Sequence, residues 1–325
     1  MISIPTRTRF RGITEREAVI FEAPQGPSEF SPFTEYDDVE AAQWLRAAIE
    51  YGWQSLPEPR LHEVEVNATI PAIAAGEVGR ILERFPGCTT AKVKVAERGQ
   101  HLADDIERVR EVRRLMGSTA RVRIDANGGW SAAEAISALR ALAEFDLDYA
   151  EQPCMAVTDL VRVREALATG GASGAGIVAP LVRIAADESV RKASDPLAVA
   201  RAGAADLIVV KAQPLGGITA AVRIVEEAGL PVIVSSALDT SVGIAMGVHL
   251  AAALPEGLLA GACGLGTVAL LEGDIVRDPL IPVGGALPVL RPELDPAALD
   301  RYAASAERTR WWRERVTRVA SLLHP

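Results

Sequence analysis

The first 60 residues carry a mixed pattern of hydrophobic and polar positions. A β-branched run predicts a strand at 19–22, and apolar residues at helical spacing predict an amphipathic helix over 38–50. Between them, residues 28–33 hold two phenylalanines in a stretch interrupted by proline. This aromatic loop either packs against its own surroundings or acts as a lid over a site, since functional lids are commonly loops. The region is predicted to be a small α+β piece.

From about residue 61, short runs of β-branched residues alternate with segments of helical periodicity. One helix is predicted to begin at Ser131, where Glu134 three residues later completes a capping box. Eight strands separated by crossover helices favour a closed parallel barrel over an open sheet. The predicted strands cover residues 63–70, 91–96, 121–127, 147–152, 182–188, 206–212, 231–236 and 259–265.

The last part of the chain, from about residue 267, begins with prolines and paired glycines and ends in an arginine-rich segment. A helix is predicted from Pro296 into this end. Trp311 and Trp312 lie in it beside arginines and could form a binding patch. The interpretation we favour is that they dock the last helix on the body of the protein.

Composition narrows the classes of function. A chain of 325 residues, 49% of them hydrophobic, can form one large domain and a smaller one. A net charge of -9 without basic runs argues against a nucleic-acid partner, and the glycine-rich run at 170–176 lacks a P-loop lysine. No stretch approaches 18 apolar residues and no apolar signal core is found, so we expect a cytoplasmic protein that does not bind membranes. Nothing in the sequence indicates an obligate protein partner.

Lysine usage is the first sign of chemistry. Only four of the 34 basic residues are lysines. This matters because arginine stays protonated in proteins, whereas lysine can be tuned into a base. Lys92 and Lys94 lie two residues apart in a β-branched run and therefore point to the same face of a strand. Such a pair is also typical of an edge strand with a solvated face. Lys192, in a hydrophilic run, is interpreted as a surface residue.

Charged residues lie at the predicted carboxyl ends of strands two to six, where a barrel of this kind builds its active site. A single carboxylate there is usually a turn or helix cap. Three from consecutive strands would meet at one mouth and repel one another unless a cation lies between them. The charged residues, in chain order, are Lys94, Asp125, Glu151, Asp187 and Lys211.

Three carboxylates without histidine or cysteine favour a divalent ion that prefers oxygen ligands, namely Mg²⁺, with Mn²⁺ as a substitute. Lysines on the second and sixth strands would flank this ion from opposite sides. Lys92 and the ion would both favour the uncharged, basic form of Lys94. Such a site can abstract a proton next to a carboxylate and hold the resulting enediolate on the metal. The residues therefore indicate metal-assisted α-proton abstraction from a small-molecule carboxylate.

The same residues resemble the enolase superfamily, and specifically its muconate-lactonising branch. The resemblance spans nearly the whole chain and rests on motifs in the family's order, namely Lys92-Val93-Lys94, Asp125-Ala126-Asn127, Glu151-Gln152-Pro153, Asp187-Glu188-Ser189 and Lys211. It implies an α/β fold, a (β/α)7β TIM-like barrel with a small α+β capping domain. Residues 1–60 would be the N-terminal part of the cap, 61–267 the barrel with the active site, and 268–325 a segment that packs back on the cap.

The resemblance also implies a role for each residue. The Mg²⁺ ligands would be Asp125, Glu151 and Asp187. Lys94 would take the α-proton and then help the hydroxyl group to leave, while Lys211 would stay protonated and stabilise the enediolate by its charge. Lys92 would tune Lys94 and touch the substrate carboxylate. Further substrate contacts are expected from Asn127, Ser235, Ser236, Gly264, Leu265 and Gly266.

The compact cap is similar to that of short o-succinylbenzoate synthases of menaquinone biosynthesis, in the segments Phe10-Arg11-Gly12-Ile13 and Glu29-Phe30-Ser31-Pro32-Phe33. The implied activity is that of a lyase, the Mg²⁺-dependent dehydration of 2-succinyl-6-hydroxy-2,4-cyclohexadiene-1-carboxylate to 2-succinylbenzoate. N-succinylamino acid racemases and dipeptide epimerases resemble it down to both lysines, and the sequence leaves this alternative open.

Other functions fit the sequence less well. A cycloisomerase is disfavoured, and so is a sugar-acid dehydratase, because no histidine falls at a strand-end base position; His249 is expected to be packed within a helix. A non-catalytic barrel that binds an acidic metabolite would not require lysine rather than arginine at positions 94 and 211.

Overall fold

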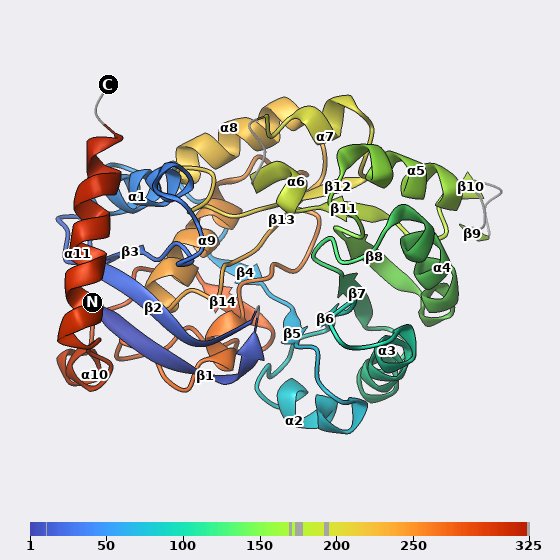
Figure 1. The fold of residues 1–325 in the computed structure, drawn as a ribbon, viewed down its shortest axis with the longest axis horizontal. Helices are drawn as coiled ribbons and strands as arrows, with labels where there is room; N and C mark the ends of the chain where they lie inside the picture. Colours follow the sequence, from blue (N-terminus) through green and yellow to red (C-terminus); the bar gives the residue numbers. More distant parts are fainter. Residues whose placement is uncertain (11, 169–170, 173–177, 192–194, 324–325) are drawn as a thin grey trace.

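The structure is a computed structural model that describes residues 1–10, 12–168, 171–172, 178–191 and 195–323. Figure 1 shows two parts, with the two ends of the chain on the same side and the curled sheet with its helices on the other. The interpretation of Lys192 as a surface residue lies outside the described residues, as does most of the glycine-rich run at 170–176.

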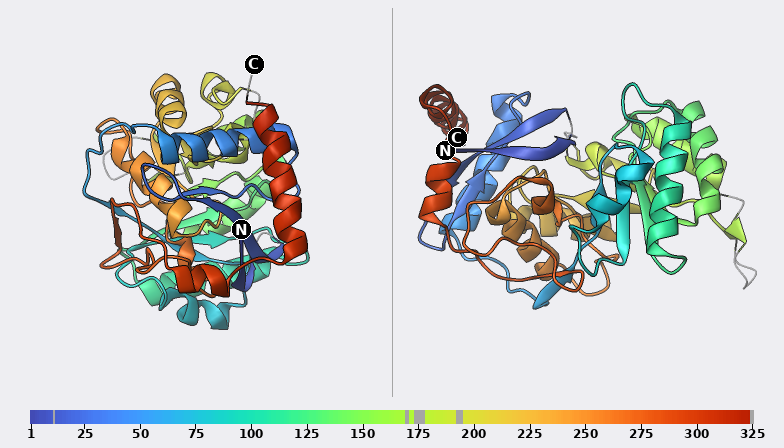
Figure 2. Two further views of the ribbon diagram at one scale, coloured as in Figure 1. Left: turned by 90° about the vertical axis from the view of Figure 1, so that its left-hand side faces the viewer. Right: turned by 90° about the horizontal axis from the view of Figure 1, so that it is seen from below.

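The N-terminal part is an antiparallel sheet with one helix from each end of the chain packed near it. Its strands are β1 (Ile2–Phe10), β2 (Ile13–Phe21) and β3 (Ser28–Phe30), paired in that order. Helix α1 (Asp38–Trp53) begins where the Asp37 side chain accepts a hydrogen bond from the Glu40 amide. Helix α11 (Ala306–Ser321) lies beside α1, so the last helix of the chain packs against the first (Figures 1 and 2).

The aromatic loop at 28–33 is part of the core of this domain. Phe30 and Phe33 are buried, and their rings meet other aromatic rings edge to face, Phe30 against Trp312 and Phe33 against Trp44. The lid interpretation of this loop is therefore wrong, and packing accounts for it. Trp312 also donates a hydrogen bond to Glu17, which confirms that this tryptophan docks the last helix.

The larger part is built on seven parallel strands that curl into a barrel. In the order of the sheet they are β13 (Val232–Val234), β12 (Leu207–Val210), β11 (Ile184–Ala186), β8 (Leu147–Glu151), β7 (Arg121–Asp125), β6 (Thr90–Lys94) and β5 (Ala68–Ile70). The eighth predicted strand, 259–265, contributes only isolated parallel bridges. These join Leu259 and Gly264 to the β13 edge, and Cys263 to Val66 beside β5, so the segment closes the barrel. The predicted (β/α)7β barrel is confirmed.

Helices cover the outer face of the curled sheet (Figure 1). They are α2 (Val78–Leu82), α3 (Leu102–Met116), α4 (Ala132–Leu142), α5 (Val157–Leu167), α6 (Glu188–Arg191), α7 (Ala198–Arg201), α8 (Ile218–Ala228) and α9 (Ser241–Ala253). The capping box at Ser131 is confirmed, since Glu134 accepts from the Ser131 amide. His249 lies in α9, half-buried against Tyr51. Within the described residues, no helix has both the length and the apolar character needed to span a bilayer.

Several predicted boundaries were wrong. The strand expected at 63–70 is divided into β4 (Glu63–Glu65) and β5, and β4 pairs outside the barrel with β14 (Ala286–Pro288). The single helix predicted from Pro296 to the end is likewise divided into α10 (Pro296–Arg301) and α11, because Ser305 caps the start of a second helix. Strand β1 was missed. Short elements complete the fold, namely β9 (Gly171–Ala172), β10 (Val178–Ala179) and the 3-10 turns Ala75–Glu77, Ala143–Phe145 and Thr267–Leu270.

Buried charges join the cap to the barrel. Arg16, on β2, donates to the carbonyl oxygen of Leu238 at 3.0 Å and lies 3.5 Å from the Asp239 carboxylate, both in the loop after β13. Glu29, on β3, accepts hydrogen bonds from Thr240 Oγ1 at 2.5 Å and the Gly243 amide at 3.1 Å. The charge of Arg16 thus acts on two buried acids, Asp239 by an ion pair and Glu29 from a greater distance. Burial, and then repulsion from Asp239, raise the pKa of Glu29 to about 7.

Replacing Glu29 by glutamine should flatten the pH dependence of folding stability. Folded Glu29 keeps its proton up to about pH 7, whereas the ordinary pKa of the side chain is 4.5. The folded state therefore binds more protons than the unfolded state in this window. Stabilisation that is complete below about pH 4.5 is lost as the pH rises through about 7. Glu29→Gln mimics the protonated form and should remove this loss, measured as the free energy of unfolding in urea at pH 5 and pH 8.

The matched control is Glu50→Gln. Glu50 is another buried cap glutamate, and it accepts hydrogen bonds from the amides of Ile218 and Thr219 at the start of α8. This variant leaves Glu29 in place and should keep the wild-type slope with pH. An unchanged slope in Glu29→Gln would show that Glu29 is not the titrating group.

Candidate active site

The carboxyl ends of the barrel strands and one residue of the cap enclose a narrow pocket. Its free volume is only about 30 Å³, because charged side chains pair with one another across it. It is lined by Phe10, Thr69, Lys92, Lys94, Asp125, Asn127, Glu151, Asp187, Glu188, Lys211, Ser235, Ser236, Ala237, Gly264 and Thr267. The structure therefore brings together all five strand-end residues singled out in the sequence.

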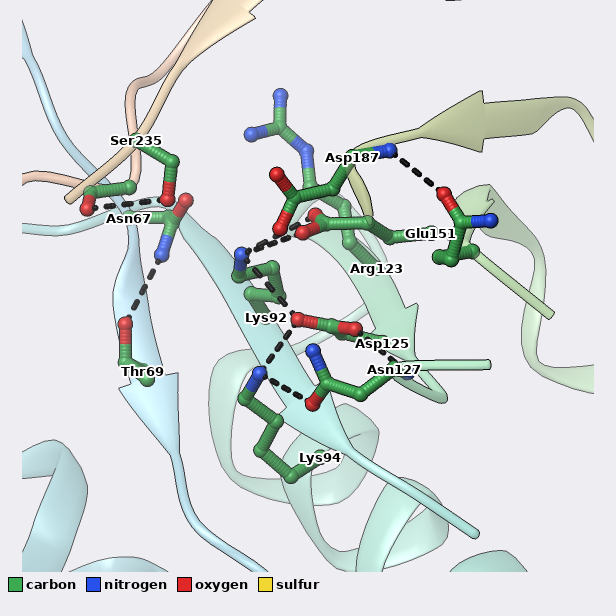
Figure 3. Close-up of polar contacts among 12 residues, drawn as sticks. Asn67, Thr69, Lys92, Lys94, Arg123, Asp125, Asn127, Glu151, Asp187 and Ser235 are labelled. Carbon is green, nitrogen blue, oxygen red and sulfur yellow. Dashed lines mark hydrogen bonds and ion pairs between the residues drawn. The ribbon is translucent and has the colours of Figure 1, made fainter. Parts of the chain in front are cut away.

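Lys92 lies at the centre of this cluster. Strand β6 has neighbours on both sides, so the explanation of the lysine pair by an edge strand is wrong. The Lys92 ammonium donates to both carboxylate oxygens of Glu151 at 3.1 Å and lies 3.5 Å from Asp125 (Figure 3). The side chain is 7% exposed. Lys92 therefore serves as a buried counter-charge for two carboxylates.

Two further lysines of the pocket, Lys94 and Lys211, also donate to its carboxylates. Lys94 Nζ donates to Asp125 Oδ2 at 2.5 Å and to Asn127 Oδ1 at 2.8 Å (Figure 3). Lys211 Nζ donates to Asp187 Oδ1 at 2.5 Å. Strands β7, β8 and β11 separate the strands that carry the two lysines, so the lysines reach the carboxylates from different sides.

Burial and neighbouring charges act in opposite directions on the carboxylates. Burial opposes the ionisation of Asp125, but Lys94 and Lys92 outweigh it and hold the pKa of Asp125 below its ordinary value. For Glu151, burial and then repulsion from Asp125 prevail over Lys92, and its pKa rises to about 7. Burial also disfavours charged Lys92, but Glu151 and Asp125 together raise the pKa of its ammonium. The pKa of Glu151 is therefore raised because burial and the nearby Asp125 carboxylate outweigh the attraction of Lys92.

Left-handed backbone at two loops holds the polar side chains in place. Asn127 has φ +46°, which turns the chain directly after β7, and its amide donates to Asp125 Oδ1 at 3.0 Å. Its side chain also donates to Glu188 at 3.2 Å. Gln152 has φ +40°, and its side-chain oxygen accepts from the Asp187 amide at 2.9 Å. The Asn127 and Gln152 contacts tie the loops after β7, β8 and β11 to one another.

The predicted substrate contacts fall into two groups. Ser235, Ser236 and Gly264 line the pocket, and Ser236 Oγ lies 2.8 Å from Thr267 Oγ1. Leu265 and Gly266 do not line it: Leu265 is buried against Gly247, and Gly266 lies beside Phe85. The wall residues that sequence reasoning missed are Phe10, Thr69, Glu188, Ala237 and Thr267.

Phe10 is the cap residue at the mouth of the pocket. The Lys94 ammonium lies 5.4 Å from the centre of the Phe10 ring. A second cavity of about 120 Å³ lies next to the pocket and shares Phe10, Lys94 and Asn127 with it. Its other lining residues are Arg9, Gly12, Pro71, Ala72 and Glu97. The first strand pair of the cap, rather than the loop at 28–33, therefore contacts the pocket.

Comparison with protein families agrees with this architecture. Residues 77–293 match the model described as "Enolase C-terminal domain-like", and residues 1–52 match "Enolase N-terminal domain-like". The chain belongs to the enolase superfamily. Within this superfamily the first match covers most of the barrel and the second covers the cap up to α1.

Individual superfamily members are also similar over the full length. The o-succinylbenzoate synthase of Mycobacterium tuberculosis is 51% identical over 326 residues, covering 100% of this chain and 94% of the relative. The o-succinylbenzoate synthase of Thermobifida fusca is 50% identical over 322 residues, covering 95% of each chain. Among solved structures, N-succinyl Arg/Lys racemase from Bacillus cereus matches with a TM-score of 0.73 at 18% identity, over 94% of this chain and 96% of that one, which shows a shared fold.

Membership in the enolase superfamily implies a divalent metal ion at this site. Within the described parts of the chain, no three His, Cys, Asp or Glu side chains converge closely enough to hold one, and Lys92 lies between two of the carboxylates instead. The donor chemistry nevertheless fits, because Asp125, Glu151 and Asp187 supply only oxygen atoms and the described lining residues include no His or Cys. Metal binding would require the carboxylates to exchange their lysine partners for the ion.

Proposed function

We propose that this protein is an o-succinylbenzoate synthase, a lyase that dehydrates 2-succinyl-6-hydroxy-2,4-cyclohexadiene-1-carboxylate to 2-succinylbenzoate in menaquinone biosynthesis. The observation that carries the proposal is its similarity to curated o-succinylbenzoate synthases, at 50–51% identity over essentially the whole chain. The pocket agrees with this reaction, since it combines lysine bases with three buried carboxylates. Loss of water makes the ring of the product aromatic, which provides the driving force.

Lys94 would perform both proton transfers. Its amine, once free of Asp125, takes the proton on the carbon next to the ring carboxylate, and the C–H electron pair becomes part of the ring π-system. The C–O bond to the ring hydroxyl then breaks, and the Lys94 ammonium returns the proton to the leaving oxygen. The products are 2-succinylbenzoate and one water, and the lysine is regenerated. One residue suffices because it serves first as base and then as acid.

Asp125, Glu151 and Asp187 would hold the divalent ion, which we propose to be Mg²⁺, with Mn²⁺ able to replace it. When bound, the ion would draw electron density from the substrate carboxylate and so acidify the adjacent C–H bond. Their burial supports this assignment, because three carboxylates that are 1–3% exposed need cationic partners. Lys92 would then give up at least one of the two Glu151 oxygens to the ion and stay nearby as a counter-charge.

The rest of the pocket would bind and orient the substrate. Lys211 would stay protonated on the other side of the ring and attract the developing negative charge. Ser235 and Ser236 would hold the distal succinyl carboxylate, with Asn127 assisting Lys94.

We place the enzyme in the cytoplasm and divide it at 60 and 267 into cap, barrel and C-terminal segment. The packing of α11 against α1 supports a C-terminal segment that returns to the cap.

A racemase or epimerase of N-succinylamino acids or dipeptides is the second candidate. The observation in its favour is that Lys94 and Lys211 both reach the pocket, from different strands, so that each could serve one face of an α-carbon. Racemisation needs both lysines to exchange protons, whereas dehydration needs only Lys94 to do so.

Two assays on the same preparation test the function directly. With Mg²⁺ present, loss of the ultraviolet absorbance of the cyclohexadiene measures dehydration, and polarimetry of N-succinylamino acids measures racemisation. We expect rapid dehydration with weak or absent racemisation. Racemisation alone would reject the synthase proposal while keeping the site. The absence of both activities would indicate a non-catalytic binding protein.

Lys94→Arg should reduce dehydration by at least about 10³-fold. Arginine keeps the positive charge beside Asp125 but cannot give up its proton, so charge-dependent binding survives and the base is lost. Steady-state kinetics measure the loss, and isothermal titration with 2-succinylbenzoate checks that binding is retained. Retained turnover in Lys94→Arg would remove Lys94 as the base.

Asp187→Asn should weaken Mg²⁺ binding by about 10-fold or more, because it removes one anionic ligand. Titration of Mg²⁺ against activity, and of Mn²⁺ by electron paramagnetic resonance, measures the effect. Asp148→Asn is the matched control: Asp148 is also a poorly exposed carboxylate in the sheet, on β8, but it pairs with Arg123 and does not line the pocket. Equal metal affinity in both variants would exclude Asp187 as a ligand.

A further inference from the structure

A buried ion pair on helix α3 lies directly behind the strand end that carries Lys94. Arg108 is 1% exposed and Asp105 2%, and their side chains are 2.9 Å apart. Arg108 Nη1 donates to the backbone carbonyl of Lys94 at 2.8 Å, and Arg108 Nε donates to the carbonyl of Ile73 at 2.5 Å. Its remaining amino group donates to the Gln100 side chain at 2.5 Å. The guanidinium thus connects α3 to the loops after β5 and β6.

Asp105 holds the same loop at Ala96, two residues after Lys94. Its Oδ2 accepts a hydrogen bond from the Ala96 amide at 3.0 Å. Ala96 has φ +58°, a left-handed conformation that non-glycine residues adopt only where their surroundings impose it. Between the two contacts, the Val95 amide donates to the Asp125 carbonyl at 3.0 Å. The ion pair therefore holds one side of the 94–96 turn and strand β7 holds the other.

The Ala96 turn also contacts the loop that carries Asn127. A side-chain carbon added at Gly129 would lie 2.9 Å from both the Cβ and the carbonyl oxygen of Ala96, so the two turns are in direct contact. Asn127, two residues before Gly129, accepts one of the hydrogen bonds of the Lys94 ammonium. A shift of the Ala96 turn would therefore disturb Lys94 both through its own backbone and through Asn127.

We propose that Arg108 is a positioning residue for Lys94, and that it sets the direction of the lysine by fixing the Lys94 peptide group from behind. This inference rests on the proposed role of Lys94 as the base. Arg108 and Asp105 form a neutral pair, so together they place little net charge near the lysine; their effect is on orientation. Proton transfer requires the amine at a defined distance and angle from the C–H bond, and small displacements are costly.

The test compares two arginines of the same helix. Arg113, also on α3, donates to the backbone carbonyls of Ala120 and Phe145, far along the helix from Lys94. Arg108→Met and Arg113→Met each remove a guanidinium that binds backbone oxygen. We expect Arg108→Met to lower kcat by about 10- to 100-fold with KM changed less than about threefold. Arg113→Met should keep kcat within about threefold, even where its melting temperature falls equally.

Two further variants separate positioning from loss of folding. Arg108→Lys retains a donor near the Lys94 carbonyl and should recover part of the lost kcat. Arg108→Met combined with Asp105→Asn leaves no unpaired buried charge, so it should fold where the single variant does not, and it should show the same kcat loss. A normal kcat in the double variant, or equal kcat losses in Arg108→Met and Arg113→Met, would overturn the proposal.

Hydrogen exchange distinguishes failure of this inference from failure of the proposed function. Amide exchange in a peptide covering residues 90–97 should be faster in Arg108→Met than in Arg113→Met, whatever reaction the enzyme catalyses. If the wild-type protein does not dehydrate the cyclohexadiene but exchange at 90–97 responds to Arg108, the assigned reaction is wrong and the attachment stands. Unchanged exchange at 90–97 rejects the positioning role itself.

Discussion

Mutual neutralisation of buried charge is the constraint on which this site depends. Asp125, Glu151 and Asp187 end or follow adjacent strands and are almost fully removed from water, so each requires a cation within contact distance. Lys92, Lys94 and Lys211 supply that charge in this structure. A divalent ion can take over part of this task, and each lysine that it releases becomes available to the substrate. The same pairing thus stabilises the folded site and limits when the base is free.

The residues around the pocket fix the backbone of the strand-end turns rather than the charged side chains themselves. Parallel register aligns Lys94 with Asp125 and Asp125 with Glu151, so that consecutive strand ends meet at one level. Behind them, side-chain hydrogen bonds to backbone groups hold the turns, as Gln152 does for Asp187 and Arg108 does for Lys94. Charged groups that must change partners during a reaction are in this way carried on backbone that need not move.

The cap contributes in two ways. It encloses the pocket through Phe10, which lies beside the Lys94 ammonium. It also holds the loop after β13, since Arg16 binds the carbonyl of Leu238, next to the pocket residue Ala237. Solved structures named for different reactions, an N-succinyl Arg/Lys racemase and a muconate lactonizing enzyme, share this fold at low sequence identity. Differences between dehydration and racemisation must then arise from the walls of the pocket and from how freely each lysine leaves its carboxylate.

The sequence by itself determined the barrel and the charged centre of the site, because both follow from local patterns. Alternating strand and helix periodicity predicts the barrel, and a charged residue at each strand end from Lys94 to Lys211 predicts the charged centre. Only the tertiary structure decided which distant groups complete the site. Phe10 reaches the pocket from a cap strand, Thr267 from beyond the closing segment, and Arg108 from the back of a helix. The aromatic loop at 28–33 was ambiguous for the same reason, since only packing against Trp44 and Trp312 distinguishes a core from a lid. Contacts between segments far apart in the chain leave no periodic pattern, so they become evident only when the chain is folded.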